Sequence, residues 1–111
     1  MSLKEKFDMA VDVVQSLPKE GPQKPTDQVR LKFYSYYKQA TIGKCNTSGP
    51  GMFSLDLVGK AKWNAWNGLG DMPSEEAMAN YVMELKKMIQ ENPSKSEDAV
   101  QAKIDKFMSM V

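Results

Sequence analysis

The hydrophobic positions of this chain recur every three or four residues, which is the spacing of an amphipathic α-helix. Ser2 followed by Glu5 is typical of a capping box and predicts the start of a first helix. A loop follows over residues 16–26, because three prolines and a glycine interrupt the pattern there. The apolar stripe of the first helix is Leu3, Phe7, Val11, Val14 and Leu17.

Two more helices are predicted in the middle of the chain. Thr26 is suited to cap the second helix, which we expect to run to about Thr41 and to stop near the next glycine. A segment rich in turn formers, residues 43–53, comes next. A third helix covers part of residues 55–69, and Gly59 leaves the position of its start open.

The last third of the chain predicts two helices. Pro73 suits the first turn of the fourth helix, which Asn92 and Pro93 end. Ser94 and Glu97 form another capping box ahead of a short amphipathic helix. The apolar stripes of these two helices are Met78, Val82, Leu85 and Ile89, and then Val100, Ile104, Phe107, Met108 and Val111. Because no alternating run of β-branched residues occurs, we expect an all-α bundle.

The composition of the chain excludes several classes of function. The 111 residues are enough for one domain, and a net charge of +1 argues against a nucleic-acid partner. The absence of histidine excludes histidine bases, His-containing triads and histidine-rich metal sites. No phosphate-cradling loop is present, and no pair of carboxylates has a spacing that suggests catalysis. We therefore expect a binding protein without a metal or cofactor, rather than an enzyme.

The same composition bears on location. A single cysteine, Cys45, cannot form an intrachain disulfide, which suits a reducing compartment. The first ten residues lack the apolar run of a secretory signal, and no stretch reaches the length of a membrane span. We expect a cytoplasmic location, or the surface of an organelle if this chain is part of a longer, anchored protein.

The second helix carries two different faces at about 100° per residue. One side is an ordinary core stripe of Val29, Phe33, Tyr36 and Ala40. The other side combines apolar bodies, phenol hydroxyls and two cations, which a core does not easily satisfy. Its members are Arg30, Leu31, Tyr34, Tyr37, Lys38 and Thr41. This second side is predicted to bind an amphipathic, anionic ligand, although half-buried tyrosines and snorkelling lysines alone would also explain it.

The third helix places a lysine within an apolar stripe. Lys62 falls between Val58 and the group formed by Ala65, Trp66 and Leu69. Such a lysine either snorkels to solvent or meets an anion where helices join. Lys60 projects elsewhere and is expected to be solvated, and the two tryptophans are expected to be core or groove wall.

Three stretches together resemble one known family. They are LKFYSYYKQAT (31–41), GKAKWNAW (59–66) and EEAMANYV (75–82), and they resemble the signature segments of the acyl-CoA-binding protein family in order and interval. The likeness covers roughly residues 7–89. It implies an up-down four-helix bundle over residues 1–92, which would bind, buffer and transport long-chain acyl-CoA without chemistry, and leaves residues 93–111 as an amphipathic helical extension.

The resemblance also implies the site. In that family the tyrosine and lysine of the YxxYK segment hold the adenine and its 3′-phosphate, and a lysine matching Lys62 adds a phosphate contact. The acyl-CoA-binding residues carried over to this chain are Val14, Gln15, Arg30, Leu31, Tyr34, Tyr37, Lys38, Lys62 and Tyr81. Two positions depart from the small family members, since Val58 and Gln15 stand where some of them have lysine. The first loop is also longer, as in larger membrane- or organelle-associated relatives.

A helical protein-interaction module that keeps the fold is the alternative. Such a module would dock a partner through the tyrosine–lysine face of the second helix or through the C-terminal helix. For the C-terminal helix three arrangements are open, which are packing on its own bundle, pairing with a second chain, or lying on a membrane surface. Its charges are mixed rather than basic, which makes the membrane the least favoured of the three.

Overall fold

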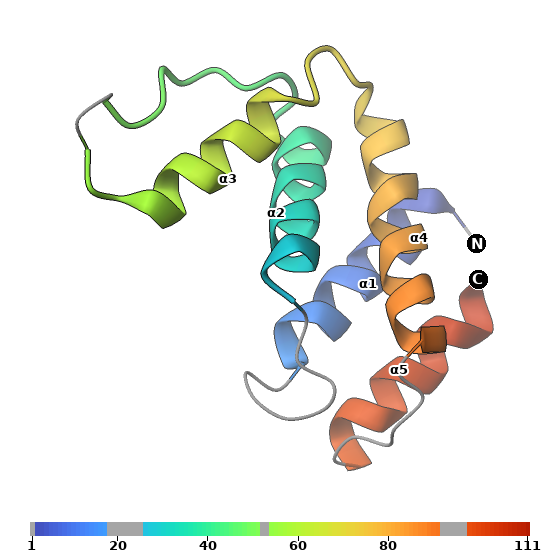
Figure 1. Cartoon of the computed structure of the whole chain (residues 1–111). Helices are drawn as coiled ribbons and strands as arrows, with labels where there is room; N and C mark the ends of the chain where they lie inside the picture. The colour runs from blue at the N-terminus through green and yellow to red at the C-terminus, as the bar shows by residue number, and fades with distance from the viewer. Residues whose placement is uncertain (1, 18–25, 52–53, 92–97) are drawn as a thin grey trace.

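The computed structural model describes residues 2–17, 26–51, 54–91 and 98–111. These residues form helices and connections without any strand, which confirms the predicted all-α class (Figure 1). None of the helices in this described part is both long and apolar enough to cross a membrane. The elements are α1 (Leu3–Ser16), α2 (Asp27–Thr41), α3 (Leu57–Asn67), α4 (Ser74–Glu91) and α5 (Asp98–Met110).

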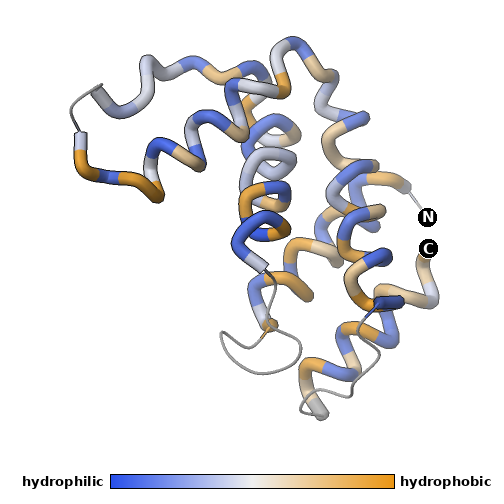
Figure 2. The backbone as a smooth tube through the Cα atoms, in the orientation of Figure 1, coloured by the Kyte–Doolittle hydropathy of each residue, from blue (hydrophilic) through white to orange (hydrophobic). Residues whose placement is uncertain are grey.

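The helices pack around α4 and α1. Both α1 and α2 pack against α4, while α3 packs against α2 and α5 packs against α1. Figure 1 shows that α3 extends sideways from the top of α2, so that its first residues lie at the edge of the molecule. Hydrophobic positions recur along the bundle helices in Figure 2 and also gather at the beginning of α3.

Side-chain caps begin the first three helices. The Ser2 hydroxyl accepts the Glu5 N–H at 3.1 Å and the Thr26 hydroxyl accepts the Val29 N–H at 3.2 Å, as the capping patterns predict. The sequence pattern does not determine where α3 starts. In the structure the Asp56 carboxylate caps the helix by accepting the Gly59 N–H at 2.9 Å.

The other helix boundaries that lie within the described residues are close to those predicted from the sequence. Pro73 lies one residue before α4 rather than inside its first turn, and its carbonyl accepts the Ala77 N–H at 3.0 Å. The bulk of the predicted first loop, the Asn92-Pro93 end of the fourth helix and the second capping box lie outside the described residues.

The buried core is one cluster that includes the C-terminal helix. Phe107 and Ile104 of α5 are buried in the same cluster as Phe7 of α1 and Leu85 of α4. At the surface of this contact the Lys103 ammonium donates to the Asp12 carboxylate at 3.2 Å and to the Ser16 hydroxyl at 2.9 Å. Of the three arrangements open for this helix, the structure has the packing on its own bundle. The boundary predicted between residues 92 and 93 lies outside the described residues, so the division stays a prediction.

A buried glutamine joins α2 to the connection before α4. The Gln39 amide donates to the Gly70 carbonyl at 3.0 Å and to the Met72 carbonyl at 2.8 Å. Its side chain is fully buried, next to the predicted core residue Ala40. The sequence pattern did not identify this residue, because a polar side chain at a helix end is ordinarily exposed.

Candidate functional site

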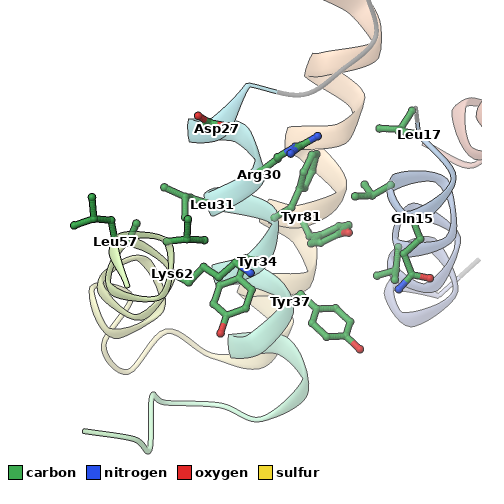
Figure 3. A pocket seen from close by; sticks show the side chains of 15 residues that line it. Gln15, Leu17, Asp27, Arg30, Leu31, Tyr34, Tyr37, Leu57, Lys62 and Tyr81 are labelled. Atoms are coloured by element: carbon green, nitrogen blue, oxygen red, sulfur yellow. The ribbon is translucent and has the colours of Figure 1, made fainter. Parts of the chain in front are cut away.

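A groove of about 830 Å³ opens where α1, α2 and the beginning of α3 face one another (Figure 3). This volume is in the usual range for a ligand-binding cavity. The floor comes from α4 through Tyr81 and the walls come from the other three helices. Eight of the nine predicted site residues line it: Val14, Gln15, Arg30, Leu31, Tyr34, Tyr37, Lys62 and Tyr81.

The wall of the groove that α1 provides is mostly apolar, and it includes part of the apolar stripe predicted for the first helix. Val11, Val14 and Leu17 of the predicted apolar stripe are only half-buried, because they pack against the edge of the core and also line the groove. Ala10 and Val13 are fully buried in the core with Phe7. The two sets differ by about one residue around the helix, and the packing of α4 and α5 on α1 determines which set is covered.

The wall provided by α3 is also apolar, and the sequence pattern only partly anticipated it. Leu57, Val58 and Ala61 line the groove together with Leu31 of α2. The spacing of Leu57, Ala61 and the following residues is the ordinary helical one, so it did not distinguish a groove wall from a core stripe.

Tyr81 supports the floor of the groove. It is 3% exposed, and its ring lies 5.2 Å from the Phe7 ring in an edge-on contact and 5.0 Å from the Phe33 ring. Burial, with a smaller contribution from Tyr37, raises the pKa of the Tyr81 phenol well above its ordinary value. The side chain extends into the space between α2 and α1 in Figure 3, as a neutral group with an apolar ring.

Two cations converge on the ring of Tyr34. The Lys62 ammonium lies 5.4 Å from the centre of this ring and the Lys38 ammonium lies 5.8 Å from it. Lys38 is also 5.8 Å from the Trp66 ring. Both distances to Tyr34 are within the range of a cation–π contact. None of the ion pairs within the described ranges involves either lysine, so both ammonium groups lie near the Tyr34 ring without a carboxylate paired with them there.

A second, smaller cavity of about 400 Å³ adjoins this cluster, and we call it the polar recess. The ninth predicted residue, Lys38, lines the polar recess rather than the groove. Tyr34 and Lys62 line both cavities and therefore mark their junction. The other lining residues are Thr47, Ser48, Gly49, Pro50, Gly59, Trp63 and Trp66, and the sequence pattern did not single out the four from the loop.

Both tryptophans hold the loop that closes the polar recess. The Trp63 indole N–H donates to the Thr47 carbonyl at 3.0 Å, and the Trp66 indole N–H donates to the Gly43 carbonyl at 2.9 Å. Gly49 has φ +71°, and a Cβ there would lie 2.6 Å from the Trp63 ring. The prediction of core or groove wall suits both, since Trp66 is buried and Trp63 lines the recess.

Thr41 does not join the site. It was placed on the same predicted face as Tyr34, but it lines neither cavity, and its hydroxyl donates to the Tyr37 carbonyl at 2.7 Å. The arrangement as a whole suits a ligand with a hydrocarbon part for the groove and a phosphate-bearing part for the recess, where ammonium and hydroxyl groups gather. The described residues contain no group of three or more acidic, cysteine or histidine side chains that could hold a metal.

The fold and the two adjoining cavities define a small helical ligand-binding protein. The model of the acyl CoA binding protein family matches residues 4–85, which is most of the chain. The chain belongs to the acyl-CoA-binding protein family.

Two relatives illustrate the sequence similarity. Acyl-CoA-binding domain-containing protein 5 of Xenopus laevis is 56% identical over 88 residues, which are 79% of this chain and 18% of the relative. Acyl-CoA-binding domain-containing protein 4 of Homo sapiens is 50% identical over 84 residues, or 76% of this chain and 31% of the relative. The chain thus spans only about a fifth to a third of the length of these two relatives.

Solved structures agree with the fold. The crystal structure of ACBP from Moniliophthora perniciosa superposes with a TM-score of 0.83 at 42% identity, covering 98% of this chain and 97% of that one. Such coverage reaches into the C-terminal helix. Acyl-CoA-Binding Protein 2 of Oryza sativa superposes with a TM-score of 0.72 at 33% identity, covering 86% of this chain and all of that one. The family and the fold support acyl-CoA binding in general.

Proposed function

We propose that this chain binds, buffers and carries long-chain fatty acyl-CoA without performing chemistry on it. The observation that carries the proposal is the position of Tyr34 and Lys62 at the junction of an apolar groove and a polar recess. Acyl-CoA has the same two parts, since a long hydrocarbon is joined to a polyanionic nucleotide. A ligand lying across the junction would satisfy both cavities at once.

Each end of the ligand has its own set of residues. Lys38 and Lys62 are assigned to the phosphates, because their ammonium groups lie on one ring with no carboxylate bound to them in the described part of the chain. Tyr34 offers its ring and hydroxyl to the adenine. Tyr37 is assigned to the adenine and its 3′-phosphate together with Tyr34 and Lys38, and Arg30 and Leu31 are assigned to the flanks of the adenine. Val14 and Gln15 belong to the segment assigned to the border of the acyl groove, and Tyr81 also lines the ligand site.

The two ends of the ligand contribute differently to the binding free energy and to selectivity. Burying a methylene contributes about 0.8 kcal/mol, so about ten in the groove would contribute roughly 8 kcal/mol before ordering costs. The same hydrocarbon is present in a free fatty acid, so the groove alone does not select the thioester. The cations and tyrosines must therefore supply the preference for CoA.

The cellular role follows from reversible binding. A carrier that removes acyl-CoA from water and releases it again would buffer its free concentration and deliver it to other proteins. We place this role in the cytoplasm, or at an organelle surface if the chain is part of a longer, anchored protein. A protein-docking role for the tyrosine–lysine face is the alternative that the following test addresses.

Calorimetric titration with palmitoyl-CoA, free CoA and palmitate in parallel tests the proposal. We expect tight one-to-one binding of palmitoyl-CoA and much weaker binding of the two fragments, because each fragment makes only part of the contacts. A folded chain that binds no palmitoyl-CoA would overturn the proposal. The tyrosine–lysine face would then be reassigned to a protein partner.

A further inference from the structure

The beginning of α3 exposes three aliphatic side chains within four positions. Leu55 is 94% exposed, Leu57 is 74% exposed and Val58 is 65% exposed. We call these three residues the α3 tip. Figure 2 shows the tip as a hydrophobic end of the segment that projects from the bundle, at the edge of the molecule.

Single exposed apolar residues are normal on a protein surface, but this group differs in two ways. The α3 tip lies on a projecting element rather than on the flat side of the bundle. It is also continuous with the groove, because Leu57 and Val58 line the groove together with Leu31. The apolar interior of the groove therefore reaches the outer surface at the tip.

We propose that the α3 tip inserts into the surface of a lipid bilayer. A stable protein–protein interface usually needs about 800 Å² from each partner, with aromatic or arginine anchors at its centre. The tip is a narrow, projecting group of aliphatic side chains and contains no such anchor. Binding at the headgroup–acyl boundary of a bilayer scales with the buried apolar area and with the attraction of cations to anionic lipids, and it has no minimum interface of that kind.

The charges near the α3 tip suit an anionic bilayer. Lys60 and Lys62 follow the tip within about one helical turn, and the exposed Arg30 lines the same groove. Two acidic residues are also near, namely Asp56, which caps α3, and Asp27, which lines the groove. Three cations and two carboxylates leave a modest positive excess, which attracts anionic headgroups.

Docking at the α3 tip would turn one end of the groove toward the hydrocarbon of the bilayer. An acyl chain would then pass between lipid and groove with little exposure to water. This use of the docking as a loading step rests on the proposed function, whereas the docking itself does not require a ligand.

Vesicle flotation tests the docking with three forms of the whole chain: wild type, Leu55→Gln and Met83→Gln. The vesicles contain phosphatidylcholine with a minority of phosphatidylserine. Leu55 is suitable because it lines neither cavity, and Met83 is a matched control because it is a 67% exposed apolar residue on α4 that also lines neither. We expect Leu55→Gln to weaken partitioning onto vesicles about tenfold, from the lost burial of one leucine. Met83→Gln should partition as the wild type does.

Three outcomes would overturn the docking. They are no binding of the wild type to vesicles, equal binding of all three forms, and equal loss in both variants. A wild type that stays off vesicles but forms dimers that Leu55→Gln dissociates would assign the α3 tip to a second copy of the chain instead. Dodecanoyl-CoA titration without vesicles separates this inference from the proposed function, because a chain that binds the thioester but not the vesicles refutes the docking alone.

Discussion

The ammonium of Lys62 lies 5.4 Å from the centre of the Tyr34 ring, at the junction of the groove and the polar recess. This contact joins α3 to α2, and Lys38 approaches the same ring from within α2. No ion pair of the described residues involves either lysine. These two ammonium groups are the ones that we propose to pair with phosphate.

The first prediction concerns these two lysines. We expect Lys38→Ala and Lys62→Ala each to weaken palmitoyl-CoA binding by about tenfold to a hundredfold, because a hydrogen bond to a charged group contributes about 1.5–3 kcal/mol. Thermal unfolding should change little, since neither lysine is fully buried. Calorimetry measures the affinity, with Lys87→Ala as a matched control because Lys87 is exposed on α4 and lines neither cavity. Equal affinities in all forms would contradict the assignment to phosphate.

The second prediction concerns the hydrocarbon end. Affinity should rise about fourfold for each methylene added to the acyl chain until the groove is filled, from about 0.8 kcal/mol per buried methylene. Val14→Thr keeps the shape of the side chain but adds a hydroxyl to the groove wall, so we expect weaker binding of palmitoyl-CoA and unchanged binding of free CoA. A titration series of saturated acyl-CoA esters measures both effects. The same proportional loss for free CoA would place Val14 away from the acyl chain.

The third prediction concerns the loop around the polar recess. Gly49→Ala should weaken palmitoyl-CoA binding, because the new methyl group would meet the Trp63 ring and the positive φ disfavours any side chain. Gly51→Ala is the control, since a Cβ at that position meets nothing within 4 Å. Calorimetry and near-ultraviolet circular dichroism of the tryptophans measure the change. If the two alanine variants bind equally well, the loop conformation around Gly49 does not contribute to the site.

The fourth prediction concerns the C-terminal helix. Phe107→Ala should lower the free energy of unfolding by about 3–5 kcal/mol, because Phe107 is fully buried in the common core. Urea denaturation measures this loss, and Ser109→Ala is the control at an exposed position of the same helix. A loss below about 1 kcal/mol would mean that α5 detaches easily in solution, and size-exclusion chromatography would then test whether it pairs with a second chain.

The fifth prediction concerns alkaline pH. The pKa of Tyr81 is raised in the folded chain by burial, and that of Tyr36 is raised by burial and by the Glu84 carboxylate. The folded chain therefore holds these protons more tightly than the unfolded chain does, and the free energy of unfolding should fall as the pH rises above 10. Each phenol contributes a slope of up to about 1.4 kcal/mol per pH unit. Urea denaturation between pH 8 and about 11 should show a shallower fall for Tyr81→Phe, and an identical slope would refute the role of this phenol.

Local features of the sequence predicted the helices and one face of α2. The caps Ser2 and Thr26 act within three residues of themselves, so their role does not depend on the rest of the fold. Phe33 and Ala40 are buried as the helical period predicts. The residues proposed for the ligand lie around two adjoining cavities.

Contacts between distant segments decided which side chains are buried, line the groove or are exposed. Val11 and Leu17 line a groove at the edge of the core because α4 and α5 pack against the neighbouring side of α1, and nothing within α1 determines that choice. Gln39 is buried because the connection before α4 passes over it, and Leu55 is exposed because α3 extends away from the bundle. Helical period and capping are local properties, so the sequence by itself determined them. Which apolar face meets another helix, a ligand or solvent depends on contacts between distant segments, and only the tertiary structure decided it.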